Sequence, residues 1–234
     1  MGQECSGKYS DMGKLGHKIL FNIYSAQKPF PLNDEEYYDS TWCQWIERIQ
    51  EGQRHEQERI QEWVDQCGDV ECFVEDFLIA EEVSEIMYAA LTVAIWSNIE
   101  SFIKETISMC ETILKQKSTN LDEIRRMNIV KCDKYLNSNI NVNLRSLQCY
   151  DFVNAVRIIS NCFKHNNGKY IEKSNNEKNN KKKNKIEEAL KREWDLECEK
   201  RIVYRKINFH KLIINCGLFC NDLKREFKKI LYKH

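Results

Sequence analysis

The sequence predicts an all-α protein, an up-down bundle of about five to seven helices. Two observations lead to this prediction. Long apolar patterns recur at the three- and four-residue spacing of amphipathic helices, and the 234 residues include only 2 Pro and 8 Gly, the residues that most often interrupt helices. Because 42% of the residues are hydrophobic, among them 5 Trp and 10 Phe, the chain is long enough to bury a core of its own.

Residues 1–32 show no regular pattern and are interpreted as an N-terminal arm, ahead of a single domain over residues 33–234. The arm begins MGQECS, which fits the myristoylation pattern at Gly2, with Cys5 as a second acylation position. We expect this short match to be coincidental, and lipidation stays open as the alternative. The 11 Cys are scattered and no secretory signal precedes them, so a reducing, cytoplasmic location is predicted.

The first helix of the domain is expected to begin at Asn33 or Asp34, either of which can cap it, and to run toward Asp65. Its acidic first turn suits the positive end of the helix dipole. Apolar residues recur at three- and four-residue steps along part of it, while residues 50–58 are almost entirely polar. We therefore expect the middle of this helix to face solvent.

The longest helical pattern in the chain runs from Val70 to Lys117 and is expected to form the central core element, paired with the helix before it. Its broad apolar surface includes Ile86 and Met87. A break into two helices near Glu81 is left open. Charged residues such as Glu100 interrupt the apolar surface, so no stretch of about 20 residues could span a membrane.

Shorter elements follow. Leu121 to about Leu136 is predicted to be a helix, and the Asn-rich stretch Asn137–Arg145 to be a loop that leads to Ser146 as the cap of the next helix. That next helix, within residues 150–170, has Phe152, Val156, Ile159 and Phe163 on one face.

Residues 171–185 are rich in Lys and Asn and, after Ile171, have nothing apolar to bury, so a flexible insertion is predicted there. It is either a solvated insertion or a basic arm that touches nucleic acid. Residues 186–199 are interpreted as a surface helix and residues 201–209 as an extended segment, after which Asn208 caps a final amphipathic helix.

Charge is distributed unevenly between the two halves of the chain. Residues 1–120 contain 10 Lys or Arg against 22 Asp or Glu, whereas residues 121–234 contain 26 against 14. Either the halves attract one another, within one chain or across a dimer, or the basic half binds a polyanion such as RNA. The acidic half is also a surface on which a partner protein could dock.

The helix within residues 150–170 carries a polar face opposite its apolar one. Arg157, Asn161 and His165 follow each other at four-residue steps, and Lys164 lies beside them. A guanidinium can bind phosphate, and an imidazole can move a proton near neutral pH. These residue types suit a phosphodiester substrate, with Asn161 to orient and Lys164 to neutralise.

The sequence contains no motif that is typical of the other common enzyme chemistries. The sequence has no P-loop, dinucleotide fingerprint, nucleophile elbow or HExxH motif. The closest cysteine spacings, Cys67-x4-Cys72 and Cys216-x3-Cys220, have no matching second pair or nearby His, and paired acids such as Glu81-Glu82 are adjacent rather than on one helix face. We predict neither a cofactor nor a metal.

The pattern Arg157-x3-Asn161-x2-Lys164-His165-x2-Gly168, near the end of a helix, resembles the signature of HEPN domains (higher eukaryotes and prokaryotes nucleotide-binding). Many HEPN domains are metal-independent endoribonucleases of prokaryotic defence and toxin systems. The resemblance implies an HEPN-like bundle and a homodimer in which two such helices form one composite site. It also implies attack by a ribose 2′-hydroxyl and a cyclic phosphate product.

Two further interpretations stay open. Seven residues separate Arg157 from His165, and Arg205-x4-His210, which is nearer to the spacing usual in HEPN domains, is the second candidate pair. Alternatively the polar face is purely structural: cations suit the C-terminal end of a helix, and Arg157 would pair with Asp151 or with an acid of the N-terminal half. The protein would then be a non-catalytic interaction module, or an RNA- or nucleotide-binding subunit of a defence complex.

Overall fold

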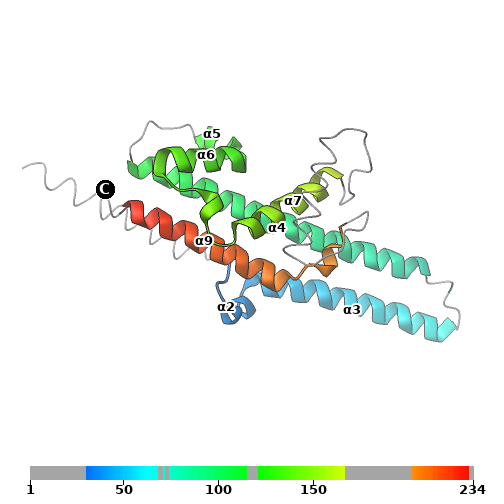
Figure 1. Cartoon of the computed structure of the whole chain (residues 1–234). Helices are drawn as coiled ribbons and strands as arrows, with labels where there is room; N and C mark the ends of the chain where they lie inside the picture. The colour runs from blue at the N-terminus through cyan, green and yellow to red at the C-terminus, as the bar shows by residue number, and fades with distance from the viewer. Residues whose placement is uncertain (1–29, 68–70, 72–73, 115–120, 167–201, 232–234) are drawn as a thin grey trace, which may run out of the picture.

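A computed structural model describes residues 30–67, 71, 74–114, 121–166 and 202–231 of the chain. Every regular element within these residues is helical, so the all-α prediction is confirmed (Figure 1). The elements are α2 (Asp34–Tyr38), α3 (Thr41–Cys67), α4 (Val74–Leu114), α5 (Leu121–Arg126), α6 (Ile129–Ile140), η2 (Leu144–Ser146), α7 (Tyr150–Asn166), η3 (Tyr204–Lys206) and α9 (Phe209–Leu231). Most of the predicted N-terminal arm, the insertion at 171–185 and the helix at 186–199 lie outside the described residues.

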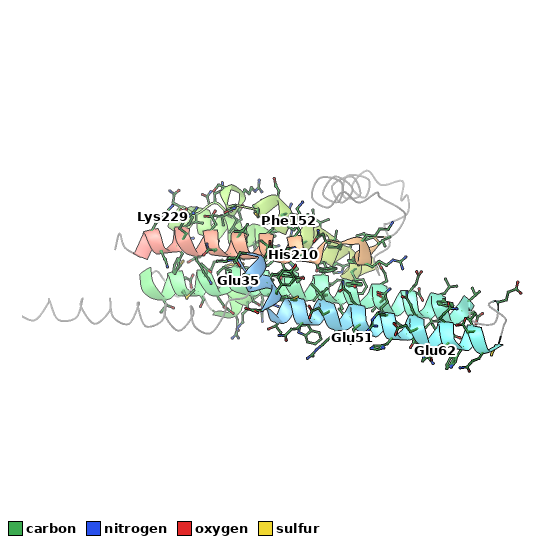
Figure 2. All side chains as sticks on the ribbon, turned by 90° about the horizontal axis from the view of Figure 1, so that it is seen from below. Glu35, Glu51, Glu62, Phe152, His210 and Lys229 are labelled. Carbon is green, nitrogen blue, oxygen red and sulfur yellow. The ribbon has the colours of Figure 1, made fainter. Side chains whose placement is uncertain are left out.

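Helix α4 organises the structure. It has 41 residues, it is continuous past Glu81, and every other described α-helix except α2 packs against it. Helix α3 lies along its N-terminal half, and together they project beyond the other described helices, as Glu51 and Glu62 of α3 mark in Figure 2. None of the described helices is long and apolar enough to cross a membrane.

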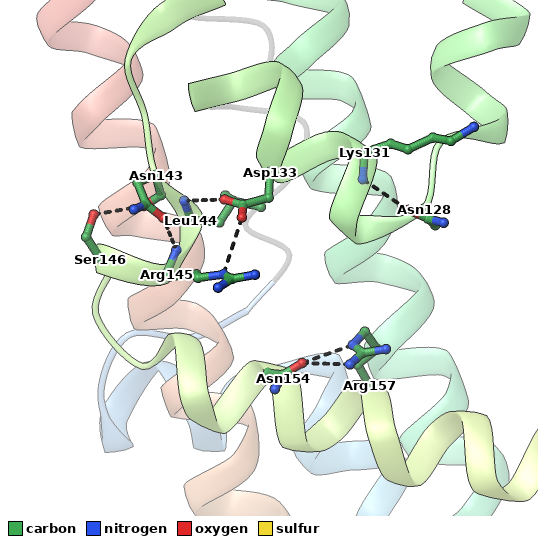
Figure 3. Close-up of polar contacts among 9 residues, drawn as sticks. All are labelled: Asn128, Lys131, Asp133, Asn143, Leu144, Arg145, Ser146, Asn154 and Arg157. Atoms are coloured by element: carbon green, nitrogen blue, oxygen red, sulfur yellow. Dashed lines mark hydrogen bonds and ion pairs between the residues drawn. The ribbon is translucent and has the colours of Figure 1, made fainter. Parts of the chain in front are cut away.

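Two predicted single helices are each divided in two, and in both cases a polar residue caps the second part. The Ser40 hydroxyl oxygen accepts a hydrogen bond from the Cys43 amide at 3.2 Å, so α3 starts anew after α2. The Asn128 side chain accepts from the Lys131 amide at 3.0 Å and begins α6 after α5 (Figure 3). A side chain that satisfies free amides at a helix start stabilises a new start by about 0.5–2 kcal/mol.

The connection between α6 and α7 comes about four residues later in the chain than predicted. Helix α6 continues to Ile140 and ends at Asn141, whose φ of 54° is the left-handed geometry that asparagine tolerates. Ser146 does not cap the next helix, because its hydroxyl donates to the Asn143 carbonyl at 2.8 Å and closes the η2 turn (Figure 3). Helix α7 therefore begins only at Tyr150.

The core forms where α4, α6, α7 and α9 meet. Helix α4 contributes Ile95, Ile99, Ile103 and Ile107, each 0% exposed. The predicted apolar face of α7 is buried at Phe152, Val156 and Ile159, and Phe163 packs against the core from the edge. In α9 the buried residues include Leu212, Ile213, Cys216, Phe219, Cys220 and Leu223. Asn208 caps α9 as predicted, since its side chain accepts from the Lys211 amide at 3.0 Å.

The segment before α9 is a short 3-10 turn, η3, within the stretch that the sequence predicted to be extended. Tyr204 is 2% exposed, and its hydroxyl donates to the Ile159 carbonyl of α7 at 2.9 Å. Its ring meets Phe163 edge-on, with centroids 5.7 Å apart. The backbone amides of Tyr204 and Arg205 donate to the carboxylate of Glu85 on α4. The turn thus ties α4 to α7.

Replacing Tyr204 with phenylalanine is expected to lower the free energy of unfolding by about 0.5–1.5 kcal/mol, because one buried hydrogen bond is lost while the ring packing stays. For a chain of this size the melting temperature should fall by about 2–4 °C per kcal/mol. Circular dichroism melts measure both. Tyr38→Phe is the matched control, since Tyr38 is 65% exposed, and its melting temperature should equal that of the parent protein.

Candidate functional site

Helix α7 presents the polar face that the sequence predicted. The helix ends at Asn166, one residue past His165. Burial of its apolar stripe against α4 and α9 fixes its rotation, so the opposite side must face outward. At 100° per residue, that side carries Tyr150, Asn154, Arg157, Asn161, Lys164 and His165.

Arg157 is the most constrained residue on this face. Its Nε and Nη2 atoms both donate to Asn154 Oδ1, at 3.0 and 2.9 Å (Figure 3). The side chain is half-buried, and this burial lowers the pKa of the guanidinium. Among the described residues no carboxylate forms an ion pair with it, and the pairing with Asp151 expected for a structural role is not formed. Arg157 is therefore a partly desolvated cation whose only hydrogen-bonding partner in the described part of the chain is the neutral amide of Asn154.

The remaining residues of the predicted site follow Arg157 along the same face. Asn161 is half-buried, whereas Lys164 and His165 are exposed on the last turn of the helix. Arg157 and His165 are eight residues apart, which places their Cα atoms about 12 Å apart along the helix axis. The structure aligns the four residues on one face, but within one chain it leaves the guanidinium and the imidazole two turns apart.

The second candidate pair is not brought together. Arg205 forms an ion pair with Glu81, Nη1 to Oε1 at 2.7 Å, and the hydrogen bond to Glu81 raises the pKa of Arg205. His210 lies at the start of α9, where its ring meets Tyr37 edge-on with centroids 4.3 Å apart. Its Nε2 atom lies 2.9 Å from Asp34 Oδ1, without the alignment of a hydrogen bond. Each residue contacts a different helix, so they form no joint site.

A hollow of about 320 Å³ lies at the N-terminal end of α7 and was not predicted. Its lining includes the cations Arg145 and Lys211, the carboxylate of Asp151 and the ring of Tyr150, and Arg145 also pairs with Asp133 at 3.5 Å. Tyr150 is seven residues before Arg157 and lies on the same side of α7, which connects the hollow to the polar face. No sequence pattern could have indicated it, because Arg145 comes from η2 and Lys211 from α9, about 65 residues apart in the chain.

Comparisons of the chain with protein-family models, curated proteins and solved structures found no match. The resemblance to HEPN domains therefore rests on the short motif from Arg157 to Gly168 and on its helical setting. In the part of the chain that the structure describes, no group of three or more His, Cys, Asp and Glu side chains is placed to hold a metal ion. A proposal about function therefore has to be argued from the residues on the polar face of α7.

Proposed function

We propose that this protein is an HEPN-like RNA-binding domain that acts as a metal-independent endoribonuclease in a prokaryotic defence or toxin system. The observation that supports the proposal is the state of Arg157, a half-buried guanidinium without a carboxylate partner among the described residues. A charge removed from water is costly unless an opposite charge compensates it. A phosphate of the RNA backbone would provide that charge and accept the remaining N–H donors.

The other residues of the face suit the steps of RNA cleavage. His165 is exposed, so its imidazole can reach a substrate and transfer a proton. In the proposed reaction the ribose 2′-oxygen bonds to phosphorus as its proton leaves to a base, and the bond from phosphorus to the 5′-oxygen breaks as that oxygen gains a proton. Lys164 would neutralise charge on the phosphate, and Asn161 would orient the ribose hydroxyl.

A second copy of the chain would bring the guanidinium and the imidazole together. Asn161 lies midway between Arg157 and His165, four residues from each. If two α7 helices pack antiparallel about a two-fold axis at Asn161, Arg157 of one protomer lies opposite His165 of the partner subunit. The two-turn separation within one chain is then an advantage, because a homodimer acquires two composite sites.

The proposal is tested by incubating the purified protein with tRNA and mRNA in the presence of EDTA. We expect fragments that end in a 2′,3′-cyclic phosphate at one side and a 5′-hydroxyl at the other, as the proposed bond changes require. Enzymatic end-labelling before and after phosphatase treatment distinguishes these ends. Intact RNA under all conditions would contradict the nuclease function.

Replacing Arg157 with alanine is expected to weaken RNA binding by about 10- to 100-fold, since a charge-assisted hydrogen bond contributes about 1.5–3 kcal/mol. The slope of log affinity against log salt concentration should also become less steep, by about the amount that one phosphate contact contributes. Anisotropy of a labelled single-stranded RNA at several KCl concentrations measures both, with His165→Ala in every protein to prevent cleavage. Arg125→Ala is the control, because Arg125 is exposed on α5 and pairs with Asp122. Equal losses in both variants would count against a specific role for Arg157.

RNA binding without cleavage is the second candidate function, and the hollow beside α7 favours it. Lys211 adds a cation next to the polar face and Tyr150 adds an aromatic ring on which a base can stack, although Arg145 in the same hollow already pairs with Asp133. Such a surface binds RNA whether or not His165 reacts. Tight binding of RNA together with intact RNA in the EDTA assay would identify this function.

A further inference from the structure

Helix α4 carries an exposed apolar surface on its projecting half. The sequence placed Ile86 and Met87 in the surface of the central core element, but they are 50% and 44% exposed. Four neighbouring side chains are exposed to a similar degree: Val74, Leu78, Ile79 and Val83. Solvent-exposed apolar residues are normally scattered, and a continuous patch of them indicates an interaction surface.

Part of this surface has the spacing of a coiled-coil seam. Successive steps of 4, 3, 4, 3 and 4 residues connect Ile79, Val83, Ile86, Ala90, Val93 and Ser97. At 100° per residue these six positions fall within about 80° of one another. The buried residues Tyr88, Leu91 and Ile95 lie on the opposite side of the helix. Alternating steps of three and four residues keep a seam facing a partner helix, so we call these six residues the α4 seam.

The sizes of the seam residues suggest what that partner is. Large side chains occupy the first half of the α4 seam and mostly smaller ones the second half. When the seam is laid antiparallel on a copy of itself, Ile79 faces Ser97, Val83 faces Val93, and Ile86 faces Ala90. Two of these three pairs oppose a large and a small side chain, an arrangement that lets two helices interdigitate without gaps or clashes.

We propose that the α4 seam is a dimerisation surface that packs antiparallel against the α4 seam of a second copy of this chain. The seam is self-complementary about a two-fold axis, which is what an interface between two identical copies requires. Helices α3 and α4 also project beyond the other described α-helices (Figures 1 and 2), and of the six seam residues only Ile79 lines the hollow that α4 forms with residues 202–205. A second copy would remove the exposed apolar side chains from water.

This surface is separate from the polar face of α7 and uses none of its residues. Loss of one surface therefore need not affect the other. If both surfaces form two-fold contacts, four chains assemble around two different axes. If only the α4 seam does, the assembly is a dimer and the cleavage assay has no composite site to detect.

The first test replaces Ile86 with aspartate. Because a charge cannot be buried in an apolar seam, the molar mass from light scattering should fall to half that of the parent protein. Val130→Asp is the matched control, since Val130 is 67% exposed on α6 and lies outside the seam. An unchanged mass for Ile86→Asp, or a parent protein that is monomeric at micromolar concentration, would overturn the proposal.

The second test determines the orientation of the two helices. Ile79→Cys and Ser97→Cys variants are mixed under oxidising conditions, with the exposed Cys67 replaced by serine in every protein. The antiparallel arrangement predicts a disulfide-linked dimer in the mixture and little in either variant alone, because facing seam positions are close enough for a disulfide. Dimers linked within the Ile79→Cys variant alone would show a parallel arrangement and overturn the proposed one.

Discussion

Replacing His165 with alanine is expected to lower the rate of RNA cleavage by about 10²- to 10⁴-fold, which is the usual contribution of a positioned general acid or base. Stability should change by less than about 0.5 kcal/mol, because His165 is exposed on the last turn of α7 and outside the core. Initial rates of cleavage in EDTA and circular dichroism melts of the same protein preparation measure the two quantities.

His55→Ala is the matched control for this variant. His55 is also exposed on a helix, with Glu51 and Glu58 within 3.7 Å of its ring nitrogens, and it is far along the chain from the polar face. We expect it to cleave RNA at the parental rate. If His165→Ala cleaves as fast as His55→Ala, the assignment of the site to α7 is wrong.

A mixture of two inactive variants separates a composite site from a site within one chain. In a dimer formed from Arg157→Ala and His165→Ala chains, one site combines both substitutions and the other retains both native side chains. When equal amounts of the two variants pair at random, about half of the dimers are mixed, and each mixed dimer has one native site out of two. The mixture should therefore recover about a quarter of the parental cleavage rate. No recovery after subunit exchange would show that Arg157 and His165 do not act across the two-fold axis.

Replacing Gly217 with alanine is expected to lower the free energy of unfolding by about 1–3 kcal/mol, the usual cost of overpacking. This is the reverse of the ordinary effect, since alanine in a helix interior is favoured over glycine by about 0.5–1 kcal/mol. A Cβ atom at Gly217 of α9 would lie 2.0 Å from the Pro31 carbonyl oxygen and 3.0 Å from its carbon. Backbone atoms cannot rotate away, so the chain before α2 would have to shift. Urea unfolding measures the change.

Gly52→Ala is the control for the close approach at Gly217. Gly52 lies on the exposed part of α3, and a Cβ atom there would meet nothing within 4 Å. The same substitution should therefore stabilise the protein by about 0.5–1 kcal/mol. A gain of stability at both positions would mean that residues near Pro31 are not held against α9.

The helices could be predicted from the sequence where a repeated apolar pattern specifies them. The stripe from Phe152 to Phe163 determined both the existence of α7 and the direction of its polar face. Helix starts were harder to predict, because Ser40 and Asn128 cap new helices although similar polar residues elsewhere do not. Whether a polar side chain caps depends on which amides the tertiary structure leaves free, and this information is not local.

The candidate site was predictable only as far as one helix carries it. Residues four apart on α7 share a face whatever surrounds them, so Arg157, Asn161 and His165 could be grouped from the sequence. The contribution of Lys211 to the hollow depends on how α9 packs and could not be predicted. The pattern also could not tell core from exposed surface on α4, because a seam for a partner helix and a buried face have the same periodicity.

The hydrogen bond from Tyr204 to the Ile159 carbonyl has a consequence for how the gene can change. It holds the start of the C-terminal part of the chain beside α7, so the residues that flank positions 167–201 stay close together whatever number of residues connects them. Each doubling of such a connection costs only about 0.6 kcal/mol of chain entropy. A change in the length of this connection therefore costs little chain entropy, and the hydrogen bond keeps Tyr204 beside α7 while the polar face of α7 keeps its geometry.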